Sequence, residues 1–293
     1  KAIQPIKPGT YINDSKTGGS SARRNPFFMI KEKEATYNTG NVYAFNLIYS
    51  GNHYACVELS TYNRLRIQNG INPYCFNKVL KENESFEAPF AVLTFSHNGI
   101  NGASNNMHHF INHHVINKNF AFKERPLLIN NWEATYFKFN EAKLLAFAKE
   151  AKEVGLELFV LDDGWFGERN NDFKGLGDYN VNKKKLPHGL DGLAKRINKL
   201  GLKFGLWFEP ESVNEDSDLY RTHPDWAIKT KNRTPSKGRH QLLLDLSKDE
   251  AYNDEFIQYL IERLLLSITT LFIISGTKAY ATTGIINEDT VKL

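Results

Sequence analysis

Two adjacent aspartates follow an apolar run in residues 158–167, which read LFVLDDGWFG. Successive strand side chains point to opposite faces, so Asp162 and Asp163 can face one ligand only where the strand has ended. Gly164 permits a turn there. Carboxylates bind hydroxyl groups through charge-assisted hydrogen bonds, and an aromatic face such as that of Trp165 packs on the apolar side of a sugar ring. This chemistry predicts carbohydrate binding; the alternative is one aspartate capping the turn and the other solvated.

Further polar and aromatic residues stand at the ends of other apolar runs: Asn130, Asn131, Trp132, Trp207, Glu209, Glu211, Arg239 and Asp245. Glu209 and Glu211 are close enough in sequence for acid and base work, although a glutamate at a strand end is more often salt-bridged or exposed. Arg239 can pair with a site carboxylate or a substrate oxygen, or it can lie on the surface of a basic loop.

Four histidines occur in HHFINHH, and His109 and His113 have the spacing of two metal ligands on one helical face. The sequence offers them neither a third ligand nor the glutamate of an HExxH motif. We therefore predict no metal and no other cofactor.

The elements that must position these residues change in kind along the chain. Over residues 1–100, short runs alternate apolar and polar residues, as on both sides of Ser50-Gly51-Asn52, a pattern typical of a hairpin in an antiparallel β-sandwich. Residues 101–124 predict a helical linker, whose apolar face holds Met107, Phe110, Ile111 and Val115.

From residue 125 onwards, strand and helix patterns alternate. Strands are expected at 125–132, 156–163, 202–210, 240–247 and 268–275, and helices at 140–155, 189–201 and 247–266. Such alternation predicts a parallel sheet covered by helices, with the polar residues at the carboxyl ends of its strands. Because glycine-rich phosphate motifs are absent, we predict an α/β fold of the partial (β/α)8 TIM barrel type, with about five strands present, over residues 125–293.

Composition narrows the classes of function. The net charge of +4 comes from Lys and Arg scattered along the chain, which does not predict nucleic-acid binding. The two cysteines have no disulfide or metal spacing, so we expect buried free thiols in a reducing compartment. Without an apolar run of membrane-spanning length or a signal sequence, the protein is expected to be cytoplasmic and not to bind a membrane.

Several motifs occur in an order that resembles bacterial α-galactosidases of glycoside hydrolase family 36. RPLLINNWEATYF, FVLDDGWFG, FGLWFEPE, SDLYRTHPDW and RHQLLLDLS resemble the catalytic barrel, and RRNPFFMI, GNVYAFNLIYSGN and RIQNGINPY resemble the end of the N-terminal β-supersandwich. The resemblance covers about Ser20 to Asp249.

The resemblance implies a retaining enzyme that removes terminal α-linked galactose from melibiose or raffinose-type sugars without a cofactor. It implies that Asp162 and Asp163 hold galactose hydroxyls, that Trp207 and Trp132 are walls of the pocket, and that Arg239 reaches the same site. Glu209 and Glu211 match its WFEPE motif without an assigned role. Homo-oligomerisation of the full-length protein stays open.

The tail, residues 267–293, departs from the pattern. The family's fifth barrel strand ends in Lys-Trp-Asp, whose aspartate is the nucleophile, whereas residues 271–277 read LFIISGT. The codons ATA-AGT-GGG-ACN for Ile274 to Thr277 would contain AAG-TGG-GAC in another frame, so a frameshift is one hypothesis and natural divergence in an inactive paralogue is the other. The family's general acid lies beyond residue 293, so we expect a truncated chain that contains neither catalytic aspartate.

The first interpretation is therefore a truncated α-galactosidase without turnover of its own. Two alternatives stay open, namely a non-catalytic galactose-binding protein and a galactosyltransferase similar to raffinose synthase.

Overall fold

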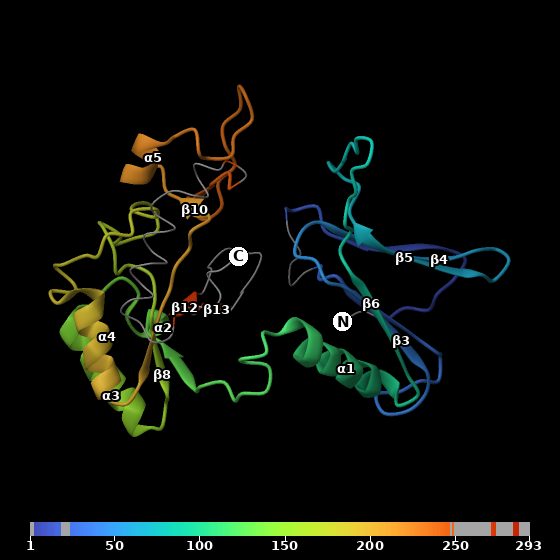
Figure 1. The fold of residues 1–293 in the computed structure, drawn as a ribbon, viewed down its shortest axis with the longest axis horizontal. Helices are drawn as coiled ribbons and strands as arrows, with labels where there is room; N and C mark the ends of the chain where they lie inside the picture. The colour runs from blue at the N-terminus through green and yellow to red at the C-terminus, as the bar shows by residue number, and fades with distance from the viewer. Residues whose placement is uncertain (1–2, 19–23, 247, 249–270, 274–283, 287–293) are drawn as a thin grey trace. The chain divides into compact units, whose positions relative to one another are not determined.

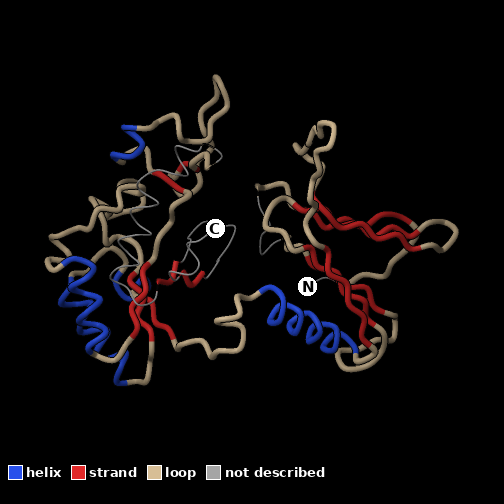
Figure 2. The backbone as a smooth tube through the Cα atoms, viewed as in Figure 1, coloured by secondary structure: helices blue, strands red, loops and turns tan. Residues whose placement is uncertain are grey.

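The computed structural model describes residues 3–18, 24–246, 248, 271–273 and 284–286. The chain divides into two compact units, Lys1–Glu124 and Arg125–Leu293, and the elements of each are seen in Figure 1 and Figure 2. Within the described ranges, no helix is long and apolar enough to cross a membrane.

The first unit contains two three-stranded antiparallel sheets, with strand orders β1-β4-β5 and β2-β3-β6. The strands are β1 Gly9–Asp14, β2 Phe27–Lys31, β3 Val42–Leu47, β4 His53–Leu59, β5 Leu65–Ile71 and β6 Ala91–Ser96. The antiparallel character expected for this half of the chain is therefore present.

The hairpin expected around Ser50-Gly51-Asn52 is wrong. β3 pairs with β2 and β6, whereas β4 pairs with β1 and β5, so residues 48–52 carry the chain from one sheet to the other. Alternating polarity identifies a strand with one covered face, but it does not identify the strand's partner.

The helix expected after residue 100 is α1, Gly99–Phe110, which continues into the π-helical turn η1, Ile111–Val115. Ala103 and Met107 of α1 are buried in one cluster with Val42 and Ala44 of β3. This part of the expected linker therefore contributes to the core of the first unit.

The second unit is built on a parallel sheet of order β7-β8-β9, comprising Leu128–Asn130, Leu158–Leu161 and Lys203–Leu206. The helices α3, Glu141–Glu153, and α4, Gly189–Lys199, lie side by side on one side of this sheet (Figure 2). All four residues of β8 are buried, as expected for a parallel strand that is covered on both faces. Asn140 caps α3 by accepting a 2.9 Å hydrogen bond from the Lys143 N–H, as its sequence position predicts.

The remaining short elements of this unit lie outside this sheet. They are α2 Trp132–Thr135, β10 Ser212–Val213, α5 Asp218–Thr222, β11 Leu242–Leu243, β12 Leu271–Ile273 and β13 Gly284–Ile286.

The fourth parallel strand expected at 240–247 is wrong. Only β11 forms there, and it pairs antiparallel with β10. Leu242 and Leu244 are buried while Leu243 is exposed, so this strand has one covered face, unlike β8. Of the expected strand 268–275, β12 is described; it lies beside β9 and pairs antiparallel with β13. The helix expected at 247–266 lies outside the described residues, and three strands form the described parallel sheet.

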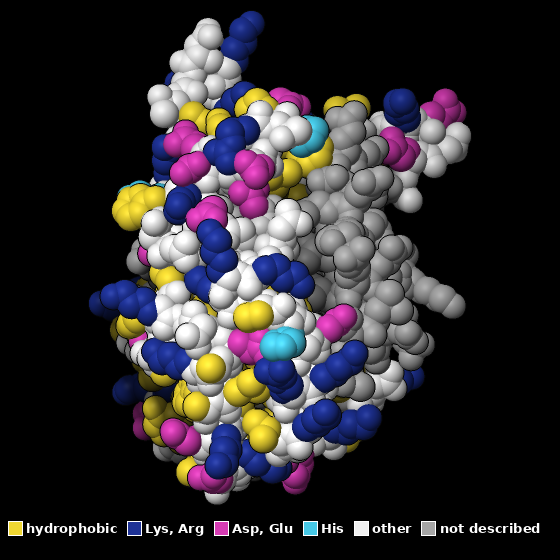
Figure 3. Space-filling view, turned by 90° about the vertical axis from the view of Figure 1, so that its left-hand side faces the viewer, with side chains coloured by type: hydrophobic (Ala, Val, Ile, Leu, Met, Phe, Trp, Pro, Cys, Tyr) yellow, Lys and Arg dark blue, Asp and Glu magenta, His cyan; other side chains and the backbone are white. Residues whose placement is uncertain are grey.

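Two further features of the fold are the distribution of its surface charges and the state of its cysteines. Lys and Arg side chains are interspersed with Asp and Glu on the described part of the face in Figure 3. Cys56 and Cys75 are both free, but only Cys56 is buried, so the expected burial of both thiols is wrong. Cys75 lies between β5 and β6, outside both sheets.

Candidate active site

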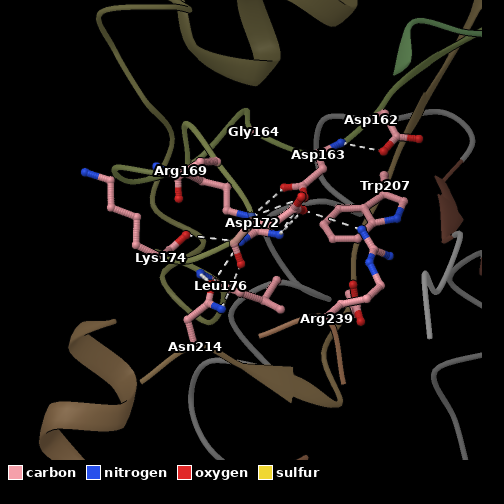
Figure 4. Close-up of polar contacts among 12 residues, drawn as sticks. Asp162, Asp163, Gly164, Arg169, Asp172, Lys174, Leu176, Trp207, Asn214 and Arg239 are labelled. Carbon is pink, nitrogen blue, oxygen red and sulfur yellow. Dashed lines mark hydrogen bonds and ion pairs between the residues drawn. The ribbon is translucent and has the colours of Figure 1, made fainter. Parts of the chain in front are cut away.

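The chain turns sharply where β8 ends. Gly164 has a φ of +95°, and a Cβ there would lie 2.8 Å from Cδ1 of Phe137. A side chain is therefore excluded both by the left-handed backbone and by the neighbouring ring. The turn separates the two aspartates that precede it, and their carboxylates contact different partners (Figure 4).

Asp162 is the more exposed of the pair. Its Oδ1 accepts a 2.7 Å hydrogen bond from the Asp163 N–H, and its Oδ2 accepts from the side-chain amide of Asn130, at the end of β7. The Asp162 N–H donates to Oδ1 of Asn131 at 2.7 Å. Burial raises the pKa of this carboxyl group, and the hydrogen bonds oppose the rise. Asn130 and Asn131 thus position Asp162 from the neighbouring strand.

Asp163 is only 3% exposed and faces Arg169, which is 0% exposed. Nε of Arg169 donates to Oδ1 at 3.0 Å, and Nη2 donates to Oδ2 at 2.8 Å. Burial raises the pKa of Asp163, while the guanidinium acts in the opposite direction. Fork-shaped pairing of this kind fixes the direction of a carboxylate as well as its charge.

The tryptophans differ in their surroundings. Trp165 is fully buried and donates from Nε1 to the Trp207 carbonyl at 3.0 Å, so it belongs to the core and cannot stack on a sugar. Trp207 is also largely buried, with its ring parallel to Phe166 at 6.5 Å between centroids. Trp132 is half-buried and makes edge contacts with Tyr136 and Phe137.

Glu209 is buried at the end of the Trp207 segment, 1% exposed, and its Oε1 has no hydrogen-bond partner among the described residues. Burial, followed by the negative charge of Glu211, raises the pKa of Glu209 to about 7. The Tyr179 hydroxyl donates to the Glu209 carbonyl at 2.6 Å and accepts from the Glu209 N–H at 3.2 Å. Glu209 is therefore held by its backbone and carries a carboxyl group that titrates near neutral pH.

Arg239 lies in an exposed loop between β10 and β11. Its Nη2 is 3.5 Å from Oδ1 of Asp172, and its positive charge lowers the pKa of both Asp162 and Glu209. Arg239 and His240 both have positive φ, 52° and 65°. Such backbone is uncommon outside glycine and often marks functional loops.

The structure thus gathers Asp162, Asp163, Trp207, Glu209 and Arg239 into one polar region, and Trp132 follows Asn130 and Asn131, which contact Asp162. Sequence reasoning missed Arg169, Tyr179 and Asn214, because each lies in a loop and no spacing rule identifies a loop residue that becomes buried. Among the described residues, no group of three metal-ligating side chains comes together, and the His109 and His113 rings stack at 4.1 Å.

Fold and site together define an α/β unit with its polar site at the carboxyl ends of parallel strands, preceded by an antiparallel β unit. The melibiase profile matches residues 85–278, and the profile of the glycosyl hydrolase family 36 N-terminal domain matches residues 2–81. The chain belongs to the melibiase family, glycoside hydrolase family 36.

Similar proteins include α-galactosidase AgaA of Geobacillus stearothermophilus, which is 47% identical over 261 residues, covering 89% of this chain and 35% of AgaA. The crystal structure of AgaB from the same organism matches with a TM-score of 0.88 and 44% identity, covering 96% of this chain and 39% of AgaB. A substituted AgaA in complex with raffinose matches with a TM-score of 0.88 and 43% identity, covering 96% and 40%. The chain thus spans about a third of the length of the curated relatives it matches.

Proposed function

We propose that this chain is the galactose-holding part of a retaining α-galactosidase that acts on terminal α-linked galactose in raffinose-type oligosaccharides. The observation that carries the proposal is its likeness, over 96% of its length, to an AgaA structure in complex with raffinose. A related AgaA structure contains stachyose, a second sugar of this type. The finer fold in this proposal is a β-sandwich segment over 1–100, a helical segment over 101–124 and the first part of a (β/α)8 barrel over 125–293.

In this proposal, Asp162 accepts hydrogen bonds from galactose hydroxyls, Trp207 and Trp132 border the apolar side of the ring, and Arg239 contacts a ring oxygen or hydroxyl. Asp163 also accepts hydrogen bonds from hydroxyl groups of the galactose, and Arg169 orients its carboxylate. Support comes from the partial exposure of Asp162, which keeps room for an acceptor contact beside its bonds to Asn130 and the Asp163 N–H.

Hydrolysis needs a catalytic nucleophile in addition to sugar binding, and this sequence does not supply one. No Lys-Trp-Asp motif occurs in the chain, so the nucleophile that the family resemblance implies is missing. We therefore expect binding of galactose without turnover. This favours a galactose-binding protein as the second candidate function. A cytoplasmic location stays a prediction, and homo-oligomerisation of the full-length protein stays open.

Calorimetry with galactose, with glucose as the comparison sugar, tests the proposed binding. Asp162→Asn should lower the galactose affinity about tenfold, because it replaces a charged acceptor by a neutral amide. Asp191→Asn, which changes an exposed aspartate on α4, is the matched control and should leave the affinity unchanged.

An assay with a nitrophenyl α-galactoside tests the absence of turnover. Release of nitrophenol at the rate of a complete α-galactosidase would contradict the prediction, and equal affinity for galactose and glucose would contradict the proposed specificity. Binding without turnover is the expected result.

A further inference from the structure

A buried arginine lies at the centre of the polar region. Besides its three hydrogen bonds to Asp163, Arg169 donates from Nη1 to the Lys174 carbonyl at 3.1 Å and to Oδ1 of Asn214 at 2.9 Å. Its Nη2 also lies 3.8 Å from Oδ1 of Asp172. Figure 4 shows the guanidinium between these groups. Arg169 therefore connects the turn after β8 to the segment that follows β10.

Asn214 extends the connection to the loop that carries Arg239. Its Oδ1 accepts from Arg169 and from the Leu176 N–H at 3.0 Å, while its Nδ2 donates to the His240 carbonyl at 3.0 Å and to the Asp172 carbonyl at 3.1 Å. Asn214 is fully buried, so each of its four contacts replaces a hydrogen bond to water.

The loop end that Asn214 holds is strained. Arg239 and His240 both adopt left-handed backbone, which costs a non-glycine residue on the order of 1 kcal/mol each. Strained backbone persists only where surrounding contacts determine it. The hydrogen bond from Asn214 to the His240 carbonyl is such a contact, and it adjoins the residue expected to reach the sugar.

We propose that Asn214 is a positioning residue for sugar binding, linking Arg169 and Asp163 on one side of the site to the Arg239 loop on the other. Asn214 need not touch the sugar. It fixes the backbone conformation from which the Arg239 side chain extends, so that Asp163 and Arg239 keep a fixed distance and orientation relative to each other. This inference rests on the proposed galactose site.

Asn214→Asp removes the donor side of this link. A carboxylate still accepts from Arg169 and the Leu176 N–H, but it cannot donate to the carbonyls of His240 and Asp172. Asn182→Asp is a matched control, since Asn182 also donates to a backbone carbonyl, that of Gly167 at 2.8 Å, and accepts from backbone N–H groups, without contact to the Arg239 loop.

The experiment measures galactose affinity by calorimetry for the unmodified chain, Asn214→Asp, Arg239→Gln and the double variant. We expect Asn214→Asp to weaken binding about tenfold, and the double variant to bind within about twofold of Arg239→Gln alone, since each change disables the proposed contact of Arg239 with the sugar. Asn182→Asp should stay within about twofold of the unmodified chain. Asn214→Ser, which adds no charge, replaces Asn214→Asp if that variant does not fold.

A rescue separates positioning from general stability. Adding His240→Gly to Asn214→Asp should recover about threefold in affinity, because glycine adopts the left-handed backbone without the strain that Asn214 otherwise opposes. Fully additive losses in the double variant, or no recovery with glycine, would overturn the inference while leaving the galactose site intact. Failure of the unmodified chain to bind galactose would overturn the proposed function and this inference with it.

Discussion

The buried carboxyl group of Glu209 should make the stability of the protein depend on pH in a specific way. Its pKa is raised from 4.5 to about 7 by burial and by Glu211. The folded state therefore holds a proton that the unfolded chain releases near pH 4.5. This contribution to stability is fully present below pH 4.5 and is lost as the pH rises through 7.

The magnitude of this pH effect follows from the difference between the pKa of Glu209 in the folded and in the unfolded state. At 1.36 kcal/mol per pH unit, a difference of roughly 2.5 units corresponds to about 3 kcal/mol. Glu209 is 1% exposed, so solvent screening reduces this figure little. Glu209→Gln cannot ionise, and the variant should lack this part of the pH dependence.

Urea unfolding followed by tryptophan fluorescence between pH 5 and pH 8 measures the effect. The free energy of unfolding of the unmodified chain should fall by about 2 to 3 kcal/mol more than that of Glu209→Gln over this range, since part of the full effect already occurs below pH 5. Glu215→Gln, which removes an exposed carboxylate from the same segment, should follow the unmodified chain. Parallel pH profiles for the unmodified chain and Glu209→Gln would refute the reasoning.

Two further predictions concern stability. Arg169→Met should lower the free energy of unfolding by about 3 to 5 kcal/mol in urea titrations, because it leaves the buried Asp163 charge unpaired; a loss under about 1 kcal/mol would show that Asp163 is neutral in the fold. Asn140→Ala should cost about 1 kcal/mol through loss of the α3 cap, whereas Asn198→Ala, within α4, should cost nothing; equal effects would contradict the capping role.

The sequence correctly predicted the helices and strands that a local pattern of apolar and capping residues defines. Asn140 and the apolar face of α3, and the continuous apolar run of β8, both formed as expected. Partner choice was not predictable, because Leu242 to Leu244 reads as a buried strand whether it pairs in parallel or antiparallel.

For the site, residue types at strand ends drew attention to Asp162, Trp207 and Arg239, which lie in one polar region and whose role in sugar binding stays a prediction. They were insufficient for Arg169 and Asn214, whose importance comes from burial among segments that are distant in sequence. Burial of a polar residue in a loop depends on the tertiary fold, so no periodic pattern in the sequence predicts it.

The contacts of Trp165 and Tyr179 have a consequence for altering the site. Both side chains form hydrogen bonds to backbone atoms of the segment after β9, at Trp207 and Glu209. These contacts hold the main chain of the segment at two points, in addition to the packing of its own side chains in the core. Because Trp207 packs in the core against Phe166 and Glu209 is buried, substitutions at these two positions that seek a new sugar preference should conserve side-chain volume.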